Sequence, residues 1–187
     1  MRLKWNGCEI STRSTQEDIN MQTKFNFNSQ IATTIEQSEH LLALGLKKET
    51  ADCYYWQETE PMYREAAGIW HLETLDSKDS QEHFEYLDKN FGVCLADDEE
   101  HYFIPAWSLA RLLEMLPWYI PIGEDLPTFD HYADLELSKV SAYYCWEDYD
   151  GELRTLASFH GNGFFAAVVD ATEWLIKEGH FNKEYLV

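Results

Sequence analysis

Basic residues are scarce in this chain. Its 187 residues include 14 Lys or Arg against 34 Asp or Glu, which gives a formal net charge of -20. A field of that sign repels nucleic acid, nucleotides and anionic membranes, so we expect neither direct nucleic-acid binding nor membrane binding. The simplest interpretation is a solvated, soluble surface. The alternative is that the acids face a basic partner protein, or imitate the phosphates of a nucleic acid.

Long hydrophobic runs and paired cysteines are also missing. No apolar stretch approaches the roughly 18 residues of a membrane span, and the N-terminus lacks the apolar centre of a signal peptide. The cysteines lie far apart, without a CxxC pair or a histidine at zinc-ligand spacing: Cys8, Cys53, Cys94 and Cys145. We therefore expect reduced thiols, no metal site, and a location in the cytoplasm of the cell that makes the protein.

Recognisable catalytic motifs are absent as well. The sequence has no GxSxG, no P-loop and no HExxH, and "DDEEH" at 97–101 lacks the glycine and the alternation of a calcium loop. Cys145 stands between two aromatic residues, which favours packing over nucleophilic chemistry. The sequence indicates no cofactor and leaves any catalytic residues unknown. An enzyme whose site is assembled from residues distant in sequence stays open.

Apolar and aromatic residues are plentiful, at 45% and 15% of the chain, which is enough to build a packed core. Residues 1–29 are polar and show no sustained period, so we expect a loosely ordered N-terminal arm, with Met21 as a candidate natural start. Residues 30–187 are predicted to form a single acidic domain.

Capping residues and apolar spacing predict several helices. Thr34 and Gln37 give a capping-box pattern before "IEQSEHLLALGL". A second helix in "IPAWSLARLLEMLP" has Pro105 in its first turn and ends at Pro117. The last helix spans about 163–178. Between them, "GIWHLETL" is strand-like and "DSQEHFEYLDKNFG" has helical spacing.

A hairpin is predicted around the turn Asp-Tyr-Asp-Gly at 148–151. Alternation assigns two sets to the core face: Val140, Ala142, Tyr144 and Trp146 on the first strand, and Leu153, Thr155, Ala157 and Phe159 on the second. The broad apolar stripe of the last helix is expected to pack across this hairpin. The prediction is an α+β fold, in which a small antiparallel sheet that includes the C-terminal hairpin packs against two to four helices.

Three segments resemble a group of uncharacterised proteins carried by phages and other mobile elements of gut Bacteroidetes. They are "IATTIEQSEHLLALGLKKETADCYYW", "IPAWSLARLLEMLP", and the hairpin followed by "ATEWLIKEGHFN". With their connections they cover about residues 31–183, and the first 20 residues fall outside the pattern. The group has no established activity, so the resemblance implies a setting, a phage or prophage gene expressed in a bacterial cytoplasm, and no site residues.

The loop before the last helix is a candidate ligand site. Free N–H groups at a helix N-terminus attract phosphate or carboxylate, which makes His160, Asn162 and Gly163 candidate ligand-binding residues. The Rossmann fingerprint needs a third spaced glycine and a βαβ unit, and neither is indicated here. Asn162 as an N-cap between turn glycines explains the stretch equally well.

Four aromatic residues are candidate partner-binding residues: Tyr143, Tyr149, Trp118 and Tyr119. Tyr143 and Tyr149 fall opposite the predicted core face of the hairpin, and Tyr and Trp are common anchors of protein interfaces. Core packing is the alternative for each of them. Aromatic anchors among dense acids suit a basic partner.

These observations favour a non-enzymatic binding protein of a phage or mobile element. It docks an acidic, aromatic surface onto a host protein, basic or nucleic-acid-binding, with counter-defence or nucleic-acid mimicry as its role. The alternatives are a protein that binds or sequesters a small ligand such as a signalling nucleotide, and the enzyme named above. The sequence does not predict an oligomeric state.

Overall fold

The computed structural model describes residues 30–57, 69–90, 92, 103–123, 126, 128 and 131–187. Within these ranges the chain forms four α-helices and two antiparallel sheets, which confirms the α+β prediction. The order of elements is α2 (Ile35–Ala43), β1 (Cys53–Gln57), β2 (Trp70–Thr74), α3 (Lys78–Asn90), β3 (Phe103–Ala106), α4 (Leu109–Met115), β4 (Tyr119–Pro121), β5 (Tyr132–Leu137), β6 (Ser141–Glu147), β7 (Leu153–His160) and α5 (Phe164–Glu178), with short 3-10 turns at Lys48–Thr50 and Lys183–Tyr185. The predicted N-terminal arm and "DDEEH" lie outside the described residues.

The smaller sheet has the strand order β2-β1-β3. Helix α3 covers one of its faces, where the ring of Phe84 packs edge-on against Tyr54 and Phe103 at centroid distances of 5.6 and 4.9 Å. The prediction that Pro105 opens a helix is wrong, because Pro105 lies in β3 and pairs with Tyr54. An edge strand tolerates the missing N–H. Helix α4 starts later, where the Ser108 hydroxyl accepts a hydrogen bond from the N–H of Arg111 at 3.1 Å.

The larger sheet has the strand order β4-β5-β6-β7. Helix α5 packs across β6 and β7, as predicted, and its Trp174 lies against the rings of Tyr144 and Phe159. Tyr144 pairs with Ala157, but the next residue, Cys145, pairs with Thr155. This β-bulge reverses the alternation before it.

The predicted hairpin faces are therefore wrong for two residues. Leu153 and Thr155 pair with Glu147 and Cys145, on the face away from α5, whereas alternation had placed them with Ala157 and Phe159. Val140 also leaves the predicted core set, because the strand begins at Ser141 and Val140 is an exposed turn residue.

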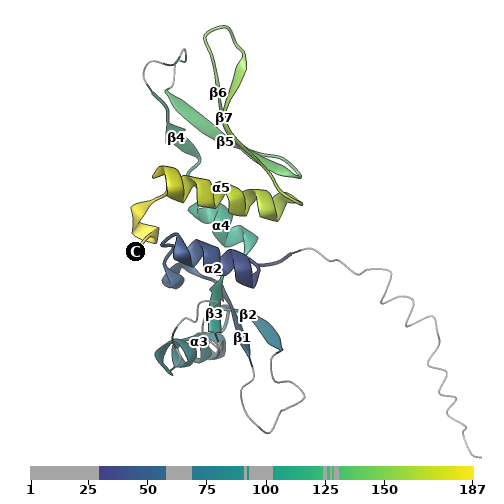
Figure 1. Cartoon of the computed structure of the whole chain (residues 1–187), viewed down its shortest axis with the longest axis vertical. Helices are drawn as coiled ribbons and strands as arrows, with labels where there is room; N and C mark the ends of the chain where they lie inside the picture. Colours follow the sequence, from purple (N-terminus) through teal and green to yellow (C-terminus); the bar gives the residue numbers. More distant parts are fainter. Residues whose placement is uncertain are drawn as a thin grey trace, which may run out of the picture.

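The main hydrophobic core lies between the two sheets (Figure 1). Helices α2 and α4 are stacked between α5 and the smaller sheet, so the core is formed by Leu41 of α2, Leu112 of α4 and Leu175 of α5, all fully buried. Trp107, which follows β3, enters the same core and donates from its indole Nε1 to the Thr50 hydroxyl at 2.9 Å. None of the helices in the described ranges is long and apolar enough to span a membrane.

Candidate functional site

The face of the larger sheet opposite α5 carries three of the candidate residues, Tyr119, Tyr143 and His160. We call it the outer face, and the strand register defines its members: Tyr119 and Pro121 on β4, Tyr132, Asp134 and Glu136 on β5, Ser141, Tyr143, Cys145 and Glu147 on β6, and Leu153, Thr155, Ser158 and His160 on β7. Paired residues on adjacent strands point to the same side of a sheet, so these side chains share one side, where Ser141 and Cys145 are buried.

Aromatic rings are exposed at the β4 end of the outer face. Tyr119 is 61% exposed and Trp118, just before the strand, is 70% exposed. The ring of Tyr119 meets Tyr132 edge-on at 5.3 Å. Prolines 117 and 121 bracket this segment, which restricts its backbone and fixes the rings' position. Two of the four predicted partner-binding residues are therefore exposed neighbours, and the register places Tyr119 on the outer face.

Tyr143 links the β6 part of the outer face to the loop before α5. It is half-buried, accepts a hydrogen bond from the Ser141 hydroxyl at 2.5 Å, and lies edge-on to the ring of His160 at 5.6 Å. The structure thus brings together Tyr143 and His160, which the sequence had assigned to two different candidate sites.

The outer face is acidic. Asp134, Glu136 and Glu147 are exposed on it beside the aromatic rings. Between residues 131 and 160 the chain has six acids and two bases. One of those bases, Arg154, is held by two carboxylates at 2.7 Å each, those of Asp148 and Glu152. Its guanidinium is therefore directed to the β6–β7 turn.

The β6–β7 turn holds the fourth predicted residue, Tyr149. The buried carboxylate of Asp148 accepts the backbone N–H groups of Asp150 and Glu152, each at 3.0 Å, and the Nε of Arg154. These bonds, first the N–H of Glu152 and then Arg154, hold the pKa of Asp148 below its usual value. Gly151 closes the turn with a positive φ of 79°. Tyr149 is 55% exposed at this fixed tip.

The Gly-Asn-Gly loop is explained by packing. The prediction that Asn162 caps the last helix is wrong, because the N-cap is Gly163 with φ of 124°, and no side chain bonds there. A Cβ atom on Gly161 would lie 2.4 Å from the Cβ of Ala166, so only glycine allows α5 to approach the strand this closely. The ligand-binding assignment of His160, Asn162 and Gly163 stays a prediction.

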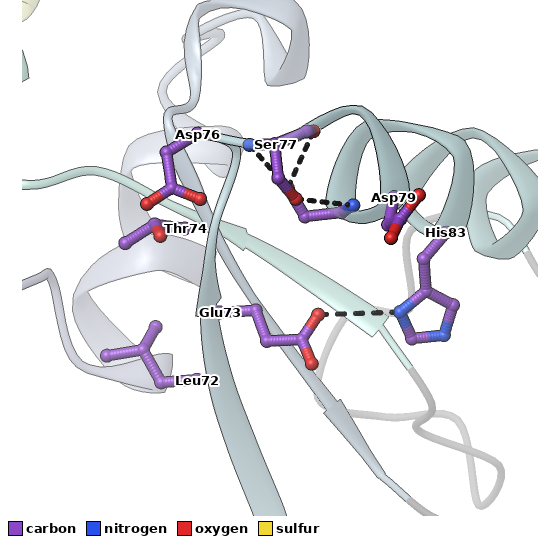
Figure 2. Close-up of a pocket in the computed structure, with 8 residues that line it drawn as sticks. Leu72, Glu73, Thr74, Asp76, Ser77, Asp79 and His83 are labelled. Atoms are coloured by element: carbon purple, nitrogen blue, oxygen red, sulfur yellow. Dashed lines mark hydrogen bonds and ion pairs between the residues drawn. The ribbon is translucent and has the colours of Figure 1, made fainter.

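A polar pocket lies at the other end of the molecule, between β2 and the start of α3. Its volume is about 550 Å³, and its lining is formed by Leu72, Glu73, Thr74, Asp76, Ser77, Asp79, Ser80 and His83 (Figure 2). The lining holds three carboxylates and one imidazole but no Lys or Arg. The Ser77 hydroxyl caps α3 by accepting the N–H of Ser80 at 3.1 Å.

Three titratable side chains converge at the wall of this pocket. The Tyr54 hydroxyl donates to a carboxylate oxygen of Glu73 and lies 2.9 Å from Nδ1 of His83. The same Nδ1 is 3.5 Å from that Glu73 oxygen, and Figure 2 shows this pair. Because the Tyr54 hydroxyl directs its proton to Glu73, Nδ1 of His83 serves as the donor to the Tyr54 oxygen. Burial, followed by Glu73, raises the pKa of Tyr54, so the hydroxyl keeps its proton.

Sequence reasoning missed this cluster entirely. Glu73 lies 19 positions and His83 lies 29 positions after Tyr54 in the sequence, so the three residues form no local motif. The β1–β2 register, which pairs Tyr54 with Glu73, brings them together, and α3 adds His83. The only available signal was helical spacing in α3, which does not specify what its first turns contact.

The two described thiols, Cys53 and Cys145, are buried and free. Burial, then the neighbouring Asp52, raises the pKa of Cys53 to about 12, and burial also raises the pKa of Cys145. Neither is poised as a nucleophile. Cys8 and Cys94 lie outside the described residues.

Within the described ranges, no group of three or more His, Cys, Asp or Glu side chains is arranged to hold a metal ion. Comparison of the chain with protein-family models, with curated proteins and with solved structures gives no significant match. The geometry of the outer face and of the pocket is therefore the basis for assigning a function.

Proposed function

We propose that this chain is a non-enzymatic binding protein that docks its outer face onto a basic protein. The observation that carries the proposal is the combination of exposed rings and exposed carboxylates on one sheet face that α5 leaves uncovered. In the setting that the resemblance implies, the partner is a host protein of the bacterial cytoplasm that binds nucleic acid or acts in defence.

The rings provide the affinity in this proposal. Trp118 and Tyr119 are large, have few rotatable bonds and each carry a polar group, so ordering them at an interface costs little entropy. Such residues dominate the binding free energy of many interfaces. Tyr132 supports Tyr119 from the next strand and keeps the ring in place before a partner arrives.

The carboxylates provide attraction and selection. Asp134 and Glu136 lie within one strand of the rings, so a basic partner surface is drawn toward the rings, whereas an acidic one is repelled. Exposed charges are screened over about 8 Å at physiological ionic strength. Binding to a basic partner must therefore weaken as salt rises.

The test is a pull-down from host lysate with three baits at low and moderate salt. The baits are the wild type, the double variant Trp118→Ala with Tyr119→Ala, and the control Tyr86→Ala, which removes an equally exposed tyrosine from α3. We expect a basic protein on the wild type and the control, lost on the double variant and lost as salt rises. Capture that is equal on all three baits would refute the outer face as the binding surface.

A second candidate function is small-ligand binding or acid–base chemistry in the pocket. The observation that favours it is that Glu73 and His83 line one cavity and are both bonded to the buried Tyr54 hydroxyl. The imidazole of His83, oriented by Tyr54 and Glu73, is suited to exchange a hydrogen bond or a proton with a ligand. The acidic lining favours cationic or neutral ligands over nucleotides.

Thermal-shift titration with a panel of small amines and neutral polyols tests the second candidate. A ligand of this pocket should raise the melting temperature of the wild type but not of His83→Gln or Glu73→Gln. His40→Gln, at an exposed histidine on α2, is the matched control. A shift retained by both pocket variants would place the ligand elsewhere.

A further inference from the structure

The two edges of the larger sheet differ in how they are protected from pairing with another strand. β4 is three residues long, ends in Pro121 and follows Pro117, so it offers little to pair with. β7 is eight residues long and contains no proline and no acid. Its one charged residue, Arg154, is drawn to the turn by Asp148 and Glu152. In the part of the chain that the structure describes, no strand pairs with the second edge of β7.

The half of β7 next to the turn projects beyond α5 (Figure 1). Leu153–Leu156 are exposed at four successive positions, so both faces of this half are open to solvent. Leu153 is 62% exposed and Leu156 is 39% exposed. Aliphatic side chains on an open edge gain free energy when a neighbouring strand removes them from water.

The β-bulge gives β7 a pattern of faces that is symmetric about the middle of the strand. The outer-face positions of the strand are Leu153, Thr155, Ser158 and His160, which are symmetric about the middle of Leu153–His160. In a regular eight-residue strand the first and last side chains point to opposite faces of the sheet. If two such strands paired antiparallel about their midpoints, each side chain would lie opposite one that points to the other face. With the bulge, Leu153 of one copy matches His160 of the other on the same face.

The charges also fit a second copy better than a basic peptide at this edge. The only formal charge on β7 is positive, so its side chains offer nothing to a basic strand. Antiparallel pairing places the acidic turn of each copy, with Asp150 and Glu152, beside the His160 end of the other copy. The two acidic turns then lie at opposite ends of the paired strands, separated by several Debye lengths.

We propose that two copies of this chain pair antiparallel through β7, across a two-fold axis at the middle of the strand, and form one continuous eight-stranded sheet. The outer faces of the two copies then lie on the same side of that sheet, because the axis is perpendicular to it. Each copy has a net charge of -20, so the copies repel at long range. Dimerisation therefore strengthens as salt rises, opposite to the salt dependence of the proposed basic partner.

Analytical ultracentrifugation of the full chain tests this proposal, at 1 to 100 μM protein in 50 and 500 mM NaCl. We expect a species of about twice the 21.9 kDa chain mass, with a dissociation constant that falls as salt rises. Leu156→Asp should weaken the dimer at least tenfold, because it places like charges beside the axis. Ile69→Asp, at an exposed residue that precedes β2 of the smaller sheet, should leave the dimer unchanged.

A charge exchange separates a lost interface from a misfolded variant. Leu156→Asp mixed with Leu156→Lys should restore a dimer that neither variant forms efficiently alone. A chain that is monomeric at 100 μM in both salts would overturn the proposal, as would a dimer that Leu156→Asp leaves intact. A mixture of the two variants that stays monomeric would also count against pairing across the axis.

Discussion

The two sheets of this protein use aromatic and titratable side chains in opposite ways. The smaller sheet turns Tyr54 and Glu73 toward α3, where they meet His83 at the wall of a pocket. The larger sheet turns Tyr119 and Glu136 toward solvent, on the face that α5 does not cover.

The difference shows how the position of one helix decides the use of a residue type. Under α3, a tyrosine hydroxyl is buried and must find a partner, so its contribution is to stability and to the pocket. On the outer face, a tyrosine keeps its polar group in water and its ring is available to another protein. Substitutions should therefore change stability in the smaller sheet and binding in the larger one.

The substitution with the largest expected effect should destabilise both sheets at once. Trp107 connects β3 to the core between the sheets and is fully buried. Trp107→Ala should lower the free energy of unfolding by about 3–5 kcal/mol, because it leaves a large cavity and removes the partner of Thr50. Urea unfolding followed by fluorescence and circular dichroism measures this loss. A loss below about 1 kcal/mol would show that Trp107 does not join the two regions.

Tyr54→Phe should affect the smaller sheet alone. Removing the hydroxyl leaves Glu73 and His83 without their shared partner, so we expect a loss of about 1–3 kcal/mol in urea unfolding. Capture of the basic partner should not change. Tyr86→Phe, at an exposed tyrosine on α3, is the control. Equal stability of Tyr54→Phe and wild type would mean that the network contributes nothing.

Raising the pH should destabilise the protein through Cys53. Its thiol has an ordinary pKa of 9.0, which the fold raises to about 12, so the unfolded chain loses a proton that the folded chain keeps. Stability is thus complete below pH 9 and falls as pH rises toward 12, by at most about 1.4 kcal/mol per pH unit for this group. Urea unfolding at pH 8, 9 and 10 measures the decline, and Cys53→Ala should flatten it. The same slope in both proteins would assign the decline to other groups.

Trp118→Ala and Tyr119→Ala should change stability least. Both side chains are mostly exposed, so we expect changes within about 0.5 kcal/mol in urea unfolding. Affinity for the captured partner should nevertheless fall at least tenfold in each variant. If these variants lost stability but kept their affinity for the partner, the larger sheet would use these rings for stability and not for binding.

The parts of the fold that were predictable depend on contacts between residues close in sequence. The capping box of α2 is present as predicted: the Thr34 hydroxyl accepts the N–H of Gln37 at 3.2 Å, and the Gln37 side chain accepts the N–H of Thr34 at 2.9 Å. The C-terminal hairpin and the helix across it were predicted from alternation and an apolar stripe, and both are confirmed.

The features that were missed depend on register and on neighbours distant in sequence. Pro105 is a normal first-turn residue of a helix by local rules, but pairing with Tyr54 places it in a strand. The register shift after Tyr144 places the side chains of Leu153 and Thr155 on the face opposite to the predicted one, and no local pattern predicts this shift. The pocket exists because β1 and β2 pair in one register. Alternation alone placed Tyr143 on the outer face, whereas Tyr119 and its neighbour Trp118 were chosen for residue type.

Site-specific photo-crosslinking to the captured partner tests most directly whether the outer face is the binding surface. A photoreactive residue replaces Tyr119 on the outer face in one protein and Tyr86 on α3 in the other, and adducts are identified by mass spectrometry. We expect an adduct with a basic protein from position 119 and none from position 86. An adduct from position 86 with none from position 119 would contradict the assignment of the outer face as the binding surface.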